Sequence, residues 1–182
     1  VPNTIWSRES SLSIKNQNWR FSVGKNLSPI FDHAVSFNSF NNSRLAPLFS
    51  VVAFATTHPL NPAQDNSLKI DWQADQNWLA SYLYRVSEGA NSMYWTAALS
   101  YQQSSDSFGL AIDHSAPLGG QGGLYSVLAS ASHQFTQAKL YANLLAQKDT
   151  NLQQRSWGGE FGLIAPVTGG NVKFSYAKGR VI

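Results

Sequence analysis

Residues that could catalyse a reaction or bind a metal are few in this sequence, and their spacing fits neither task. The histidines show no ligand spacing, so the sequence predicts no metal site and no cofactor. The run Asp113-His114-Ser115 holds the residue types of a hydrolytic triad, but a triad is defined by geometry and not by adjacency in sequence. The glycine-rich run 119–123 lacks the Lys-Ser/Thr of a phosphate-binding loop. The chain is therefore not predicted to be an enzyme. The histidines are His33, His58, His114 and His133.

Charged residues are scarce and scattered, which excludes several other classes of function. They make up 13% of the 182 residues, against about 25% in an ordinary soluble domain. The 13 lysines and arginines form no dense stretch, so no nucleic-acid-binding surface is predicted. The longest apolar run, residues 51–55, falls far short of the roughly 18 apolar residues that a membrane helix needs. The 43% of hydrophobic residues must therefore be distributed over another kind of element.

Apolar and polar residues alternate along most of the chain, as they do in β-strands with two different faces. Leu68, Ile70 and Trp72 fall on one face of a strand, while Lys69 and Asp71 fall on the other. Helical periodicity is weak throughout. Such runs predict about ten strands, many of them near the length of roughly 9–11 residues that a tilted strand needs to cross a bilayer. We place them at residues 6–15, 19–25, 67–74, 77–85, 92–102, 107–114, 124–135, 138–148, 155–166 and 171–180.

The connections between these strands alternate between short and long. Polar turns such as 16–18 and 168–169 are separated by longer links such as 115–123 and 149–154. An up-and-down barrel, with small turns on one side of a membrane and larger loops on the other, has this pattern, which a Greek-key sandwich is not expected to keep. The sequence therefore predicts an all-β fold, an antiparallel transmembrane up-and-down β-barrel.

Aromatic residues gather near the predicted strand ends. In a transmembrane barrel, aromatic bands flank the apolar belt at both membrane interfaces. We assign to these bands Trp19, Trp78, Tyr84, Tyr94, Trp95, Tyr101, Phe108, Tyr125, Phe135, Trp157 and Tyr176.

One connection, residues 26–66, is much longer than the others and carries several prolines. Loops beyond about 12–15 residues are uncommon and usually functional. Its first half is rich in apolar side chains that a fully solvated loop has no need of. We expect this loop to fold back inside the barrel and to pack these side chains on the wall, and residues 48–56 could form a further short strand. The apolar residues are Ile30, Phe31, Val35, Phe37 and Phe40.

Six segments of the chain carry the pattern of a known family. They are residues 6–10, 19–26, 28–32, 66–72, 158–162 and 169–177. They resemble the general trimeric porins of Gram-negative, proteobacterial outer membranes. In that family a strand leads directly into the third external loop, which folds into the lumen and narrows it. The family has about sixteen strands and roughly twice this length. The resemblance therefore implies that residues 1–182 are an internal segment of a porin barrel, with 26–66 as its inward-folded constriction loop.

The resemblance also implies a function and a site. The function is passive diffusion of small hydrophilic solutes and ions through a water-filled channel. Lys25 stands at the position of a wall arginine that faces the inward loop, and Asp32 is the matching loop carboxylate. His33 and Arg44 add titratable and positive groups to the same loop, where carboxylates are few. We therefore expect weak selectivity or an anion preference. The implied partners are further copies in a homotrimer, outer-membrane lipid and lipopolysaccharide, and the implied location is the cell outer membrane.

Four more charged residues are candidates for the lumen wall, because alternation places them opposite the apolar face. They are Arg20, Lys69, Asp71 and Arg85. 

Two alternatives to a pore remain open from the sequence. One is a soluble β-sandwich that binds carbohydrate, which would fold without detergent. The other is an outer-membrane barrel that hydrolyses lipid, which would lose its activity when a serine or histidine is replaced.

Overall fold

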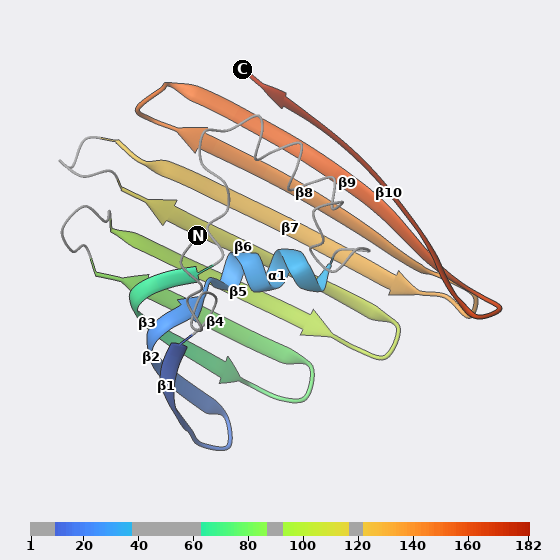
Figure 1. The fold of residues 1–182 in the computed structure, drawn as a ribbon, viewed down its shortest axis with the longest axis horizontal. Coiled ribbons are helices and arrows are strands. Elements are labelled where there is room, and N and C mark those ends of the chain that lie inside the picture. The colour runs from blue at the N-terminus through green and yellow to red at the C-terminus, as the bar shows by residue number, and fades with distance from the viewer. Residues whose placement is uncertain (1–9, 38–62, 87–92, 117–121) are drawn as a thin grey trace, which may run out of the picture.

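The structure is a computed structural model in which residues 10–37, 63–86, 93–116 and 122–182 are described. These residues form ten strands and one helix (Figure 1). The helix, α1 (Pro29–Ser36), follows the second strand. The strands are β1 (Ser10–Lys15), β2 (Trp19–Leu27), β3 (Ala63–Gln73), β4 (Trp78–Arg85), β5 (Tyr94–Gln102), β6 (Asp106–Ser115), β7 (Leu124–Gln134), β8 (Lys139–Asp149), β9 (Gln154–Val167) and β10 (Gly170–Val181).

All ten strands belong to one sheet and follow one another in sequence order. Every neighbouring pair is antiparallel, from β1 with β2 to β9 with β10. This is the up-and-down arrangement that the alternation predicted, and each of the ten predicted strands is present. The all-β fold class is confirmed. A single sheet also contradicts the alternative of a soluble sandwich, which needs two packed sheets.

The two faces of the sheet have the opposite polarity to those of a soluble protein. On one face of the β2–β3 pair, Trp19 lies opposite Trp72 and Val23 opposite Leu68, and these side chains are exposed. The other face carries buried polar side chains, among them Lys69, which is 5% exposed. Exposed apolar rows and buried polar rows are typical of a sheet with lipid outside and polar groups inside.

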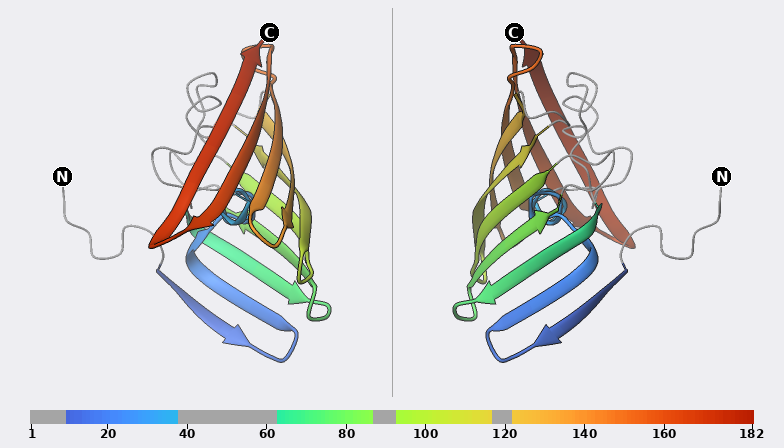
Figure 2. Two further views of the ribbon diagram at one scale, coloured as in Figure 1. Left: turned by 90° about the vertical axis from the view of Figure 1, so that its right-hand side faces the viewer. Right: turned by 90° about the vertical axis from the view of Figure 1, so that its left-hand side faces the viewer.

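The sheet curls around α1, which lies on its concave side (Figure 2). We call the concave side the inner face and the convex side the outer face. Among the described residues, β1 and β10 are the two edges of the sheet. No helix in the described part of the chain is long and apolar enough to cross a bilayer.

The connections agree with the prediction at most positions. Residues 16–18, 74–77, 103–105 and 168–169 are short turns at one end of the strands, which we call the turn end. The other end, where β2, β4, β6 and β8 end and the strands that follow them begin, is the loop end. One connection differs, because β8 and β9 extend further than predicted. They leave residues 150–153 between them, a link no longer than the turn 74–77.

Aromatic side chains form a band on the outer face near the turn end. The Trp78 and Tyr101 ring centroids lie 4.8 Å apart, and the Tyr101 and Phe108 centroids also lie 4.8 Å apart. Tyr94 was wrongly assigned to these bands. It points to the inner face, is 3% exposed, and its hydroxyl lies 3.2 Å from Asp113 Oδ2. Alternate residues of a strand point to opposite faces, so the position of a tyrosine in this alternation decides which face it lies on. Tyr94 stands two positions before the buried Thr96 and therefore belongs to the polar inner row.

Candidate functional site

The helix α1 begins where the sequence supplies a start signal. The Ser28 hydroxyl accepts a hydrogen bond from the Phe31 amide at 3.4 Å, which caps the first turn. Pro29 stands at the first helical position, where its missing N–H costs nothing, and Asp32 lies in the first turn, where a negative charge is favoured. The sequence interpretation missed this helix. A capping serine, a proline and an early carboxylate are a recognisable signal, but the segment is too short for its periodicity to stand out.

An apolar cluster inside the concave face holds α1 against the wall. Ile30 is fully buried and Ala34 is 2% exposed, and both belong to a cluster formed with Ala111, Leu128 and Leu145 from β6, β7 and β8. These wall residues stand in the inward rows, where most neighbours are polar. Leu128, for example, lies between the buried serines of its own strand. An apolar residue in an otherwise polar inward row is the sequence signal for where the loop docks.

A buried histidine of α1 packs closely against the wall. His33 is 3% exposed, and its Nδ1 lies 3.2 Å from the Ser100 hydroxyl oxygen. A Cβ on Gly109 would lie 2.3 Å from His33 Cε1, so this glycine makes the space for the ring. Burial lowers the pKa of His33 from 6.5 to about 4. The imidazole is therefore neutral at physiological pH.

Polar contacts fix both ends of α1 to opposite parts of the wall. At the first turn, Asp32 Oδ2 accepts a hydrogen bond from Lys69 Nζ of β3 at 2.7 Å. At the other end, the Phe37 carbonyl accepts a hydrogen bond from the Asn143 side-chain amide of β8 at 2.9 Å. The helix thus spans the concave side from β3 to β8.

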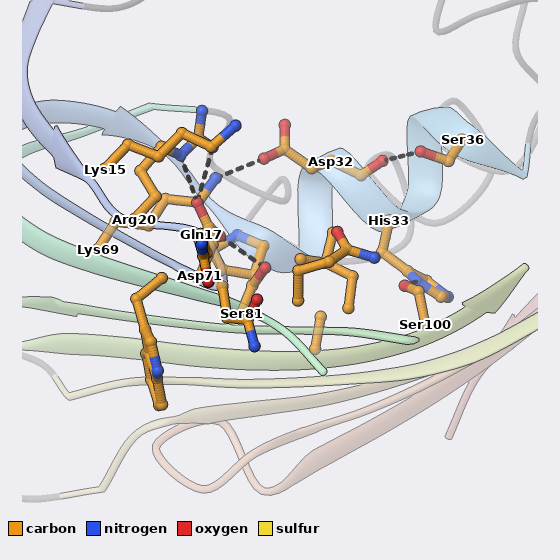
Figure 3. A pocket seen from close by; sticks show the side chains of 16 residues that line it. Lys15, Gln17, Arg20, Asp32, His33, Ser36, Lys69, Asp71, Ser81 and Ser100 are labelled. Atoms are coloured by element: carbon orange, nitrogen blue, oxygen red, sulfur yellow. Dashed lines mark hydrogen bonds and ion pairs between the residues drawn. The ribbon is translucent and has the colours of Figure 1, made fainter. Parts of the chain in front are cut away.

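A cavity of about 370 Å³ lies between α1 and the strands β1 to β5. Figure 3 shows Lys15, Arg20 and Lys69 gathered at one side of it, close to Asp32 and Asp71. The lining therefore holds three cations and two carboxylates. Uncharged polar side chains complete its polar surface: Gln17, Asn18, His33, Ser36, Gln73, Ser81 and Ser100.

Most of the charged side chains in this cavity have a defined hydrogen-bonding partner. The Arg20 guanidinium contacts Asp71 Oδ2 with two nitrogens. Nε lies 2.8 Å from this oxygen and Nη2 lies 2.7 Å from it. The Ser81 hydroxyl donates to the other Asp71 oxygen at 2.7 Å. Lys69 is shared between Asp32 and the Leu27 carbonyl, which lies 3.2 Å from Nζ. Among the described residues, Lys15 is without an ion pair. The cavity is thus lined by two ion pairs, Arg20–Asp71 and Lys69–Asp32, and by one further positive group, Lys15.

The remaining predicted residues lie elsewhere. Lys25 stands at a β-bulge in β2 and pairs with Asp65 at 3.2 Å, so it does not form the expected pair with Asp32. The lysine that pairs with Asp32 is Lys69. Arg85 donates to the Gln64 side chain at 2.6 Å and does not line the cavity. Arg44 lies outside the described residues.

The run Asp113-His114-Ser115 does not form a catalytic group. Adjacent residues of a strand point to opposite faces. Asp113 lies on the inner face with Tyr94, whereas His114 stacks on Tyr125 at a centroid distance of 4.2 Å on the outer face. The carboxylate and the imidazole are therefore separated by the sheet.

Comparisons with solved structures identify the fold. No protein-family model and no curated protein matches the chain. An anion-selective porin from Comamonas acidovorans matches with a TM-score of 0.79 at 20% identity, over 93% of this chain and 56% of that one. OmpT, an outer membrane protein of Vibrio cholerae, matches as its loop L8 deletion mutant with a TM-score of 0.51 at 12% identity, over 96% of this chain and 74% of that one. The chain thus spans a little over half the length of the Comamonas porin. These similarities establish that its fold is a porin-like antiparallel up-and-down sheet.

Proposed function

We propose that this chain is part of an outer-membrane porin, whose water-filled channel passes small hydrophilic solutes and ions by passive diffusion. The observation that carries the proposal is the inverted polarity of the sheet, together with a helix that crosses its concave side. Exposed apolar side chains on the outer face suit lipid, and charged, hydrogen-bonded side chains on the inner face suit water.

The proposed constriction consists of α1 and the wall that faces it. A channel needs a wet lumen, a narrow point, and charges there that bias which ion enters. The low-dielectric wall focuses the field of these charges along the lumen. The cavity beside α1 holds Lys15, Arg20 and Lys69 against Asp32 and Asp71. With this surplus of positive charge, we propose a weak preference for anions.

The likeness to known porins supports the location and the assembly. The Comamonas structure is described as an anion-selective porin, and the Vibrio structure as an outer membrane protein. By analogy, the protein is proposed to lie in the cell outer membrane, to be surrounded by lipid and lipopolysaccharide, and to form a homotrimer. Residues 1–182 would supply ten strands of a closed barrel of about sixteen strands.

Electrical recording tests the proposal directly. The full-length protein, reconstituted into a planar lipid bilayer, is expected to produce discrete conductance steps. In a gradient of potassium chloride, its reversal potential should have the sign of a weak anion preference. Absence of conductance by protein that is folded in detergent would contradict the channel, and a strong cation preference would contradict the assigned charge balance.

A further inference from the structure

Four positively charged side chains gather on the outer face at the loop end of β8, β9 and β10. Lys148 is the penultimate residue of β8, Arg155 the second residue of β9 and Arg180 the penultimate residue of β10. Lys178 lies two residues before Arg180, on the same face. All four residues are exposed.

The strand rows show that these cations face outward. Residues two apart in a strand point to the same face. Trp157 follows Arg155 by two positions and Tyr176 precedes Lys178 by two, and both aromatic residues are exposed on the outer face. Lys148 lies directly opposite Arg155 in the register of β8 and β9 and therefore shares its face. The four side chains thus belong to the apolar rows and not to the lumen.

No carboxylate of the described chain neutralises this cluster. None of the four cations has an ion-pair partner within the described ranges. The carboxylates of the same strands, Asp149 and Glu160, are buried on the inner face, and Glu160 is bonded to Asn143 and Ser175. The outer face of these strands therefore carries positive charge with no compensating negative charge.

The cations are also close enough to repel one another. Lys148 and Arg155 form a directly opposed pair, which places their Cβ atoms roughly 4.5–5.5 Å apart. Arg155 exchanges both backbone hydrogen bonds with Ile182, at 2.9 and 2.7 Å, so Arg180 lies diagonally across from it. Like charges that face each other across strands destabilise a sheet. Such an arrangement is favourable when an external anion lies among the cations.

The outer face next to the cluster, toward the middle of the strands, is apolar and suits the apolar part of an amphipathic ligand. Leu144, Trp157, Phe161 and Tyr176 continue the same rows toward the middle of the strands, and they are 48–66% exposed. Cations at a membrane interface attract anionic lipid headgroups, and Arg and Lys form charge-assisted hydrogen bonds to phosphate. An exposed apolar surface directly below such cations suits acyl chains.

We propose that Lys148, Arg155, Lys178 and Arg180 bind the phosphates of a phosphorylated glycolipid in the outer leaflet, of the lipid A type. The proposal rests on the proposed function, because the porin topology is what puts the loop end of the strands in that leaflet. The cluster covers three strands that lie about 4.8 Å apart, so it is about 10 Å wide. This width is greater than one phosphate needs, and it favours a lipid with two phosphates.

Lipid binding by matched double variants tests the site. The variant Lys148→Gln/Arg155→Gln removes two outward cations at the loop end. The control Lys139→Gln/Lys173→Gln removes two cations at the turn end, where Lys139 lies over the Tyr141 ring on the inner face. Native mass spectrometry of the full-length protein in detergent would measure binding of diphosphoryl lipid A and of its dephosphorylated form.

The wild type and the control should bind diphosphoryl lipid A at least tenfold more tightly than the dephosphorylated form, and the Lys148/Arg155 variant should lose this difference. Equal binding of the two lipids by the wild type, or retention of the difference by the variant, would overturn the site. If the variant instead dissociates into monomers with no change in lipid binding, the cluster is a protein contact and the proposal is wrong. Conductance of the same wild-type sample is a separate readout, because a folded protein that binds lipid without conducting contradicts the pore and not the phosphate contacts.

Discussion

At the scale of single residues, the cavity beside α1 is defined by which charges are paired. Asp71 is held by Arg20 and Ser81, and Asp32 is held by Lys69. Two cations are thus engaged with carboxylates that they largely neutralise. Lys15 lines the same cavity, is exposed and lacks an ion pair among the described residues. It is therefore the side chain whose charge an ion in the cavity would sense most fully.

Replacement of Lys15 by glutamine should lower the ratio of anion to cation permeability by roughly two- to threefold. A unit charge about 7 Å from an ion in water contributes about 0.6 kcal/mol, which salt at about 0.15 M reduces to roughly 0.3 kcal/mol. This energy attracts an anion and repels a cation, so the ratio changes by about 0.6 kcal/mol, which corresponds to that factor. Stability should hardly change, because Lys15 is exposed. Reversal potentials in a salt gradient measure the effect. Lys178→Gln, on the outer face, is the control and should leave the ratio unchanged, whereas an equal effect of both variants would contradict the assignment of Lys15 to the lumen.

His33 predicts how the docking of α1 depends on pH. Burial lowers its pKa from 6.5 to about 4. As the pH falls through 6.5, the undocked state takes up a proton that the docked state does not. By linkage, docking then weakens between about pH 6.5 and pH 4 and levels off below that range. Above pH 6.5 the docked helix keeps its full stability.

Hydrogen exchange of the α1 amides, expressed as protection factors at pH 7 and pH 4.5, measures this dependence. Protection should fall at pH 4.5 in the wild type, whereas His33→Gln should make it nearly independent of pH. His133→Gln, which removes the histidine paired with Asp106 at the turn end, should behave like the wild type. The same fall in both variants would show that another group is responsible.

At the scale of elements, α1 connects strands of the sheet that are far apart from one another. It is fixed to β3 through Lys69, to β8 through Asn143, and to the middle of the sheet through Ile30 and Ala34. A segment with contacts at both ends and along its length keeps one position. A fixed position is what the proposed constriction requires, because a helix that moved would change the width of the proposed channel.

The contact of α1 with β6 is most sensitive at Gly109. A Cβ there would lie 2.3 Å from His33 Cε1 and 2.7 Å from the Leu99 carbonyl oxygen, and the carbonyl is backbone that cannot easily move. Gly109→Ala should therefore cost about 1–3 kcal/mol, as overpacking does, and should lower the single-channel conductance by displacing α1 toward the lumen. Urea unfolding and conductance measurements check both effects.

Gly159→Ala is the matched control for this substitution. Its nearest neighbour would be the end of the exposed Leu144 side chain at 3.3 Å, which can turn away. The free energy of unfolding should change by no more than about 0.5 kcal/mol. A Gly109→Ala protein as stable and as conductive as this control would show that α1 is not seated against β6.

The strands could be predicted from the sequence because alternation is a local signal. Lys69 and Asp71 stand between Leu68, Ile70 and Trp72, so the polar row and the apolar row follow without any knowledge of the partners. The sequence could not show which charges pair, because Lys69 and Asp32 are 37 positions apart. Their meeting depends on how α1 is placed. That placement depends on apolar wall residues such as Leu128, which appear as exceptions within the polar rows.

At the scale of the whole molecule, one sheet separates two environments. The outer face exposes Leu144, Val127 and Phe174 to 66%, 44% and 54%. The inner face carries α1, the charged cavity and the buried polar rows. A sheet in water would bury the first set of side chains and expose the second. The molecule therefore suits a bilayer around its convex side and water on its concave side.

Accessibility of single cysteines on alternate positions tests this claim most directly. Residues 1–182 contain no cysteine, so this part of the protein contributes no background thiol. Ser81 and Ser100 line the cavity, whereas their neighbours Tyr82 and Leu99 are exposed on the outer face. In the protein reconstituted in a bilayer, a charged, water-soluble thiol reagent should react with Ser81→Cys and Ser100→Cys and reduce the current. It should leave Tyr82→Cys and Leu99→Cys unmodified. Equal reaction at all four positions, or reaction at the second pair alone, would contradict the account.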